Sequence, residues 1–228
     1  MRTLLAAACL AMTLAGCEAY VPVETPPIGN IERDYLLCFV LDTSGSFSPR
    51  MFEGEQLGYK FFLRASDQFF RNRMEPHDRI LVSQLSANNR TLLWEGPPLT
   101  LRRQFGSAEA LQRFIQERSD PAGSRVYAAL ADSLDYIHNL PGVSDGKTTV
   151  CVLVLSDMMD TSAAPEIDRQ RMTEALSRFG QTKGCIGLYW VDQRWLTDCR
   201  QYLNDAGIQQ YVVESDIVAD PALPFAEQ

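Results

Sequence analysis

One carboxylate and two hydroxyls follow directly after a continuous apolar stretch near the start of the chain. The stretch is Leu36–Leu41, and Asp42, Ser44 and Ser46 come next at alternate positions. An apolar run without polar alternation is typical of a strand buried on both faces in a parallel sheet. Binding crevices of open α/β sheets lie at the carboxyl ends of such strands, so these three side chains can point into one crevice. Their oxygen atoms favour a hard divalent cation.

A helix is predicted to begin immediately after this segment. Ser48 is the expected N-cap, and Pro49 suits the first helical position because it has no N–H to satisfy there. The partial positive charge of the helix N-terminus would then face the same crevice.

The D-x-S-x-S pattern resembles the metal-ion-dependent adhesion site of von Willebrand factor type A (vWA) domains. Two later segments agree with this resemblance. Residues 123–130 (GSRVYAAL) are similar to a segment in which the family carries Thr, with Ser124 in its place. Residues 148–157 are similar to the fourth strand of the family, with Asp157 at the Asp of its T-D-G motif. The chain departs from the pattern by Ser124 for Thr and by Met158 for Gly, and the second change could narrow or reshape the site.

The resemblance implies a metal site made of five residues. Ser44, Ser46 and Ser124 would be neutral hydroxyl ligands, while Asp42 and Asp157 would act directly or through water. Few protein ligands and several waters suit Mg²⁺ best, with Mn²⁺ or Ca²⁺ as possible substitutes. In the family, the remaining coordination position is typically taken by an acidic residue of a partner protein.

The rest of the chain alternates between helical and strand patterns, which predicts an α/β fold: a doubly wound, mostly parallel sheet with helices on both faces. The resemblance implies six strands over residues 31–215, in the order 3-2-1-4-5-6 with strand 3 antiparallel. The expected strands after the first are Asp78–Ser86, Arg90–Glu95, Thr148–Asp157, Cys185–Val191 and Gln209–Glu214. The expected helices are 49–74, Ser107–Arg118 with Ser107 as cap, one that begins after Ser124, 165–179 and Gln193–Asp205. Residues 216–228 are expected to form an irregular tail.

The amino terminus predicts a bacterial lipoprotein. Residues 1–16 have a basic start and a short apolar stretch, and the segment Leu14–Cys17 resembles the lipoprotein box, after which Cys17 would carry lipid. Residues 17–30 contain three prolines and no periodicity, so they are expected to be a tether. By analogy with such proteins, Glu18 after the lipidated cysteine favours the outer membrane. The predicted location is the cell envelope, facing the periplasm or the surface.

The charge of the chain argues against some partners. Its net charge is −8, and it becomes about −9 once the signal peptide, which contains Arg2, is removed. A nucleic-acid or anionic-lipid surface would require clustered Lys and Arg.

Four cysteines remain beyond the signal and the lipid: Cys38, Cys151, Cys185 and Cys199. They allow three complete pairings, and a bridge between Cys185 and Cys199 is the first hypothesis, since a strand and a returning helix can bring them together. The sequence contains no Cys-x-x-Cys motif and no cluster of Cys and His, so it gives no support for a zinc site.

Three functions are compatible with these observations. The favoured one is cation-dependent binding of a partner protein, without enzymatic activity. The second is a degenerate vWA scaffold that binds without metal. The third is a phosphatase-like hydrolase that uses Asp42 as nucleophile, although such enzymes would need an Asp where Ser44 stands. Asp160 could support the site from a second layer.

Overall fold

The computed structural model of the chain describes residues 34–71, 75–85, 91–120, 123, 125–215 and 221–225. All of them belong to one compact unit, Arg33–Gln228. The predicted signal peptide, Cys17, the tether and Ser124 lie outside the described residues. Within the described part, no helix is both long and apolar enough to cross a membrane.

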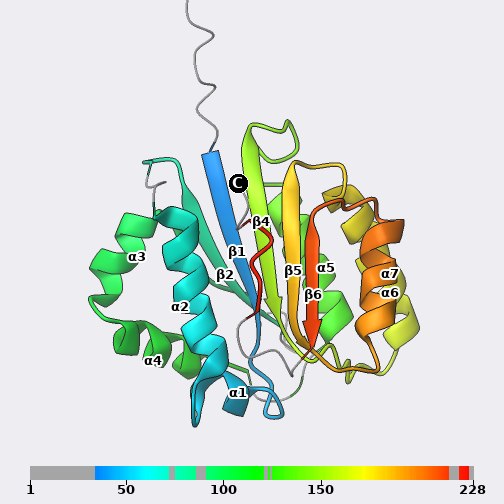
Figure 1. The fold of residues 1–228 in the computed structure, drawn as a ribbon, viewed down its shortest axis with the longest axis horizontal. Helices are drawn as coiled ribbons and strands as arrows, with labels where there is room; N and C mark the ends of the chain where they lie inside the picture. Colours follow the sequence, from blue (N-terminus) through cyan, green and yellow to red (C-terminus); the bar gives the residue numbers. More distant parts are fainter. Residues whose placement is uncertain are drawn as a thin grey trace, which may run out of the picture. The chain divides into compact units, whose positions relative to one another are not determined.

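Six strands form one sheet in the order β3-β2-β1-β4-β5-β6 (Figure 1). Only β3 runs antiparallel to its neighbour β2, and the other pairs are parallel. This confirms the predicted topology. The carboxyl ends of the parallel strands β1, β4 and β5 therefore lie together at one end of the sheet, which we call its carboxyl edge. The strands are β1 (Asp34–Asp42), β2 (Arg79–Leu85), β3 (Leu92–Gly96), β4 (Thr148–Leu155), β5 (Gly184–Val191) and β6 (Tyr211–Ser215).

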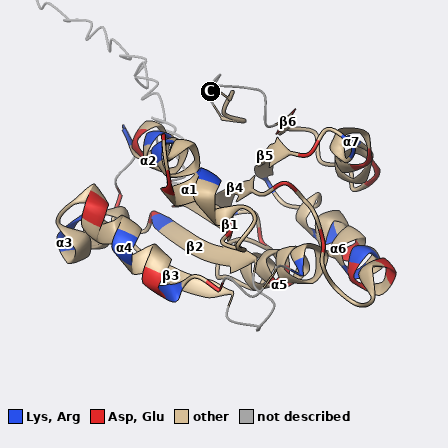
Figure 2. Ribbon diagram, turned by 90° about the horizontal axis from the view of Figure 1, so that it is seen from below, with Lys and Arg blue, Asp and Glu red and all other residues tan. Residues whose placement is uncertain are grey.

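Helices cover both faces of the sheet (Figure 2). One face packs against α5, α6 and α7, and the other packs against α1, α2 and residues of α3 and α4. The helices are α1 (Ser48–Phe52), α2 (Leu57–Phe70), α3 (Pro98–Phe105), α4 (Ala108–Arg118), α5 (Val126–His138), α6 (Pro165–Phe179) and α7 (Leu196–Asp205).

The central strand β1 supplies side chains to two different cores. Leu36, Cys38 and Val40 join a mainly aliphatic cluster under α5, α6 and α7, whereas residues 37, 39 and 41 join a cluster rich in aromatic rings under α2. All six side chains are completely buried, which confirms the prediction of a strand covered on both faces.

The helical segment predicted over residues 49–74 is wrong as a single helix. Helix α1 ends at Phe52 and α2 begins at Leu57, because Gly54 (φ +56°) and Gln56 (φ +53°) adopt left-handed conformations that an α-helix does not contain.

Helix α3 was not predicted; Pro97-Pro98 starts it, and Gly106 ends it in a left-handed conformation. Ser107 caps α4 as predicted, accepting a hydrogen bond from the Ala110 amide at 3.2 Å.

The proposed bridge between Cys185 and Cys199 is also wrong. All four cysteines are buried free thiols. Cys185 faces the aromatic core together with Cys151, whereas Cys199 of α7 lies in the aliphatic core together with Cys38. The sheet therefore separates the two residues that the hypothesis paired.

Candidate metal centre

Asp42 ends β1 and connects it to the end of β4. Its carboxylate is completely buried: one oxygen accepts a hydrogen bond from the Ser44 amide at 3.0 Å, and the other accepts one from Ser156 Oγ at 2.8 Å. Ser156 Oγ in turn accepts from the Met158 amide at 2.9 Å. The orientation of Asp42 is thus fixed by the residues that follow both central strands.

Burial of Asp42 has an electrostatic consequence. Loss of solvation raises the pKa of its carboxyl, the hydrogen bonds from Ser44 and Ser156 lower it, and the neighbouring charge of Asp157 raises it again, with burial the largest effect. The ionised carboxylate therefore lies in an environment that disfavours its charge. A cation at this edge would stabilise the ionised form.

The two serines of the pattern lie side by side after β1. Ser44 Oγ and Ser46 Oγ are 3.2 Å apart, with Ser44 buried and Ser46 exposed. The turn is closed by the amides of Phe47 and Ser48, which donate to the Ser44 carbonyl at 3.1 and 2.8 Å. The hydroxyls of Ser44 and Ser46 thus lie together after the carboxyl end of β1, one buried and one exposed.

The predicted role of Ser48 as N-cap is wrong. Helix α1 already includes Ser48; Phe47 occupies the N-cap position, and no side chain caps the helix. The Ser48 amide at the start of α1 instead donates its hydrogen bond to the Ser44 carbonyl in the preceding turn.

Asp157 follows β4 and is held less tightly than Asp42. It is partly exposed, and its carboxylate accepts a hydrogen bond from the Met159 amide at 3.0 Å. Its backbone carbonyl accepts from the Asp192 amide at 3.1 Å, which joins the ends of β4 and β5. The carboxylates of Asp157 and Asp42 are close enough for the charge of Asp157 to affect the pKa of Asp42.

The sequence interpretation missed a charged pair beside Asp157. Arg194 Nε and Nη2 each lie 2.9 Å from the Asp192 carboxylate. Hydrogen bonds from Arg194 lower the pKa of Asp192 to about 2. The charge of Asp157 is among the influences that raise the pKa of Arg194. The signal that could have identified this pair is its position, directly after the carboxyl end of β5.

The loop before α5 carries Ser124, whose neighbours are described. Gly123 has φ +125°, and a side chain there would come within 3.2 Å of Thr161 Oγ1 in the loop after β4. Gly123, before α5, and Thr161, in the loop after β4, therefore lie close together.

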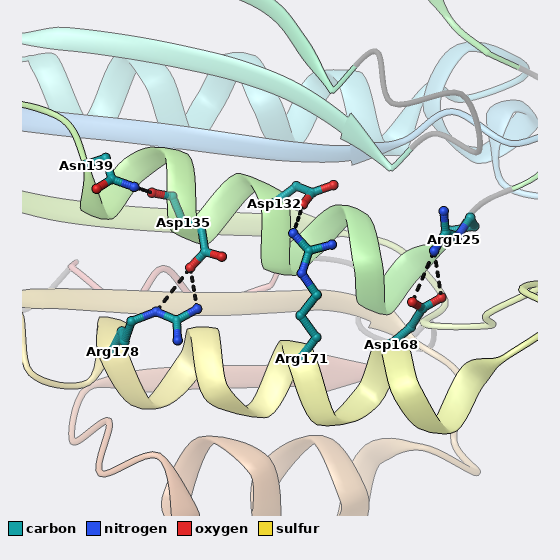
Figure 3. A network of polar contacts seen from close by, with 7 residues as sticks. All are labelled: Arg125, Asp132, Asp135, Asn139, Asp168, Arg171 and Arg178. Carbon is teal, nitrogen blue, oxygen red and sulfur yellow. Dashed lines mark hydrogen bonds and ion pairs between the residues drawn. The ribbon is translucent and has the colours of Figure 1, made fainter.

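Ion pairs connect α5 and its N-cap residue Arg125 to α6 (Figure 3). Arg125 Nη2 lies 3.1 and 3.2 Å from the two carboxylate oxygens of Asp168, which is buried in the first turn of α6. Arg171 pairs with Asp132, and Arg178 pairs with Asp135 at 2.6 Å further along the helices.

Asp160 has a structural partner at the start of α5. One of its carboxylate oxygens accepts from the Tyr127 amide at 2.9 Å, and the other accepts from the Ser162 amide at 2.6 Å. The carboxylate thereby satisfies an N–H of the first helical turn and connects it to the loop after β4. Asp160 is thus placed to support the site through the backbone of both loops.

Met158, where the vWA pattern has Gly, retains the backbone conformation that suits Gly. Its φ is +62°, and its side chain is buried at 2 % exposure in the aliphatic core. A left-handed conformation costs a residue with a Cβ roughly 1–2 kcal/mol. The buried side chain offsets that cost, because burying a Met stabilises by about 1.5–3 kcal/mol. The substitution therefore preserves the turn after Asp157.

The described part of the site offers hydroxyl, carboxylate and carbonyl oxygens. No group of three or more His, Cys, Asp or Glu residues arranged for a metal occurs among the described residues. The donor set that the resemblance implies has only two carboxylates and is otherwise made of hydroxyls, and such an all-oxygen set would fit Mg²⁺ or Mn²⁺.

Comparisons with known proteins show the fold. No protein-family model matches the sequence, and no curated protein matches it. The VWA domain of SpRpn10 superposes with a TM-score of 0.56 at 8% identity, covering 84% of this chain and 92% of that one. The pilus adhesin SpaC from Lactobacillus rhamnosus GG gives 0.54 at 10% identity, covering 82% of this chain and 28% of the adhesin.

A third solved structure is that of the manganese-loaded Plasmodium vivax TRAP protein. It gives a TM-score of 0.50 at 14% identity, covering 80% of this chain and 69% of that one. The sheet order, the antiparallel β3 and these superpositions agree, and we conclude that residues of the described unit have the fold of a von Willebrand factor type A domain.

Proposed function

We propose that this vWA-fold domain binds a divalent cation at the carboxyl edge of its sheet and uses it to hold an acidic residue of a partner protein. Asp42, Ser44 and Ser46 would hold the cation together with Ser124, and Asp157 would contribute directly or through water. When bound, the cation supplies a positive charge with a free coordination position for a carboxylate oxygen. Mg²⁺ is the proposed ion, with Mn²⁺ or Ca²⁺ as substitutes.

The observation that carries this proposal is the arrangement around Asp42. A buried carboxylate with its orientation fixed lies near a second acid and beside two adjacent hydroxyls, which is an electrostatically unfavourable arrangement for the ionised form of Asp42. The chain nevertheless builds it at the edge where α/β sheets bind ligands. A cation would compensate both carboxylates at once.

Two of the structural neighbours support the proposal by analogy. One is a pilus adhesin, and another is a TRAP protein in a manganese-loaded form. The resemblance of the D-x-S-x-S segment to the adhesion site of vWA domains points in the same direction.

The proposed role is binding and not catalysis. A phosphatase-like reaction would use Asp42 as nucleophile and would need a second acid two residues further along the chain. Ser44 stands where the second acid of such an enzyme would be needed, and a serine hydroxyl is a poor general acid at neutral pH.

We also propose that lipid on Cys17 anchors the domain to a bacterial membrane, as the lipoprotein box predicts. Replacing Cys17 with Ser should move the protein from the membrane pellet to the soluble fraction when expressed cells are fractionated. Equal partitioning of wild type and Cys17→Ser would contradict the anchor.

The interaction itself can be tested by cross-linking capture from cell-envelope extracts, with the full chain as bait. We expect a partner that is captured with Mg²⁺, lost on chelation, recovered when Mg²⁺ is restored, and absent with Asp42→Ala. Asp145→Ala is the matched control, since Asp145 is an exposed aspartate in the loop before β4, at the opposite edge of the sheet. Capture that persists in the chelator would favour the metal-independent scaffold, and release of phosphate from model esters would favour the hydrolase.

A further inference from the structure

Cys151 and Cys185 are directly paired residues on neighbouring parallel strands. The register of β4 and β5 matches Cys151 with Cys185, and both side chains face the aromatic core. Burial raises the pKa of the Cys151 thiol, and a hydrogen bond with the Cys185 thiol raises it further. The register therefore places the two thiols beside each other on one face of the sheet.

The spacing of these strands suits a disulfide. Neighbouring strands lie about 4.8 Å apart, and bridged cysteines have Cα atoms roughly 4.4–6.8 Å apart. Gly184 brings the two strands close beside the pair, because a Cβ there would lie 2.8 Å from the Val150 carbonyl oxygen. Side chains of paired residues in parallel strands point to the same face, so the two thiols lie on the same side of the sheet.

A cavity gives the pair a route to solvent. A space of 390 Å³ opens at the amino ends of the strands, and both cysteines line it together with Lys183, Tyr35 and Phe225. Cys185 is 5 % exposed and Cys151 is 1 % exposed, so Cys185 is the more accessible sulfur. This cavity lies at the opposite edge of the sheet from the candidate metal centre.

We propose that Cys151 and Cys185 form a redox-active pair that closes a disulfide between β4 and β5 by exchange with an external disulfide. The Cys185 thiolate attacks the external disulfide, forms a mixed disulfide and releases the first thiol. The Cys151 thiolate then attacks the Cys185 sulfur and releases the second thiol. Two protein thiols become one disulfide, the external disulfide takes up both electrons, and the two protons end on the released thiols.

The bond would join two strands whose following residues belong to the candidate site. Asp157 follows β4 and Asp192 follows β5. A bridge between positions 34 residues apart restricts the unfolded chain, so the oxidised protein should unfold at a temperature higher by about 5–15 °C. The inference does not depend on metal binding.

The test is oxidation of the full chain with glutathione disulfide, both in the folded state and during refolding from urea. Free thiols are then alkylated in denaturant, and the digested protein is analysed by mass spectrometry. We expect a Cys151–Cys185 linked peptide, alkylated Cys38 and Cys199, and an oxidation-dependent rise in melting temperature. A link that forms only during refolding would overturn the proposal of a redox-active pair in the folded protein, because the cavity would then give the oxidant no route to the thiols.

Two variants provide the comparison. Cys151→Ala should abolish the rise in melting temperature on oxidation. Cys199→Ala removes an equally buried cysteine from the other face of the sheet and should retain the rise. Alkylation of Cys151 and Cys185 to the same extent as Cys38 and Cys199 under both conditions would overturn the proposal, as would a link to a different cysteine.

Discussion

The two aspartates that follow the central strands differ in how the protein holds them. Asp42 is completely buried and accepts hydrogen bonds from two separate segments, whereas Asp157 is partly exposed and accepts one from its own loop. The same residue type at equivalent strand ends therefore has two roles. Asp42 contributes to both the architecture and the proposed ligand set, while Asp157 contributes a charge that the fold itself does not need.

This difference corrects one expectation from the sequence. Asp42 was expected to point into a binding crevice at the carboxyl ends of the strands. The structure instead places it in the interior, where its loss leaves the Ser44 amide and the Ser156 hydroxyl without their acceptor. An unsatisfied buried donor costs about 1–3 kcal/mol.

The largest effect is expected for Asp42→Ala. Cation affinity should fall by at least about a thousandfold, or about 4 kcal/mol, because a charged ligand is removed. The free energy of unfolding, measured in urea with chelator present, should also fall by about 1–3 kcal/mol. An unchanged stability in chelator would show that Asp42 has no architectural role.

The next largest effect concerns the turn after Asp157. Met158→Ala should lower the free energy of unfolding by about 2–5 kcal/mol, since it empties a buried site between α5 and α6. Met158→Gly should be less destabilising than Ala by about 1 kcal/mol, because Gly tolerates the left-handed backbone. Urea titration of both variants measures the difference, and the reverse order would contradict the backbone argument.

Asp157→Asn should weaken cation binding while leaving the stability of the fold nearly unchanged. Cation affinity should fall by about 10- to 100-fold, as for a group that acts through water or at the margin of a metal site. The unfolding free energy in chelator should change by less than about 0.5 kcal/mol, as for most surface substitutions. A loss of stability as large as that of Asp42→Ala would remove the distinction between the two aspartates.

The smallest effect is expected at Ser124. Ser124→Ala should weaken cation binding by less than about tenfold, since a neutral hydroxyl adds geometry but no charge. Ser124→Thr keeps the hydroxyl and should keep wild-type affinity. If the Ala variant bound the cation as well as wild type does, Ser124 would have no place in the ligand set.

The sheet was predictable because its signals are local. The apolar runs at residues 36–41 and 150–155 have no polar alternation, and helix α6 was predicted with the bounds it has. The break between α1 and α2 was not predictable, because Gln56 in a left-handed conformation carries no signal that separates it from a helical Gln. The prediction of a bridge between Cys185 and Cys199 was wrong for a related reason, because spacing along the chain does not reveal which face of the sheet a residue occupies.

The candidate site was predictable as a set of residues but not as an electrostatic arrangement. The pattern around Asp42 indicated oxygen ligands. It gave no indication that Ser156 would hold the carboxylate, or that Asp192 and Arg194 would lie beside Asp157. The contacts of Ser156 with Asp42 and of Asp192 with Asp157 join segments more than 30 residues apart, and only the folded sheet brings them together.

The most direct test of the account is calorimetric titration of Mg²⁺ and Mn²⁺ into the full chain, its Asp42→Ala variant and the Asp145→Ala control. We expect saturable binding of one cation by wild type and by Asp145→Ala, and no measurable binding by Asp42→Ala. Equal affinity in wild type and Asp42→Ala, or no binding by wild type, would show that these residues do not form a metal site.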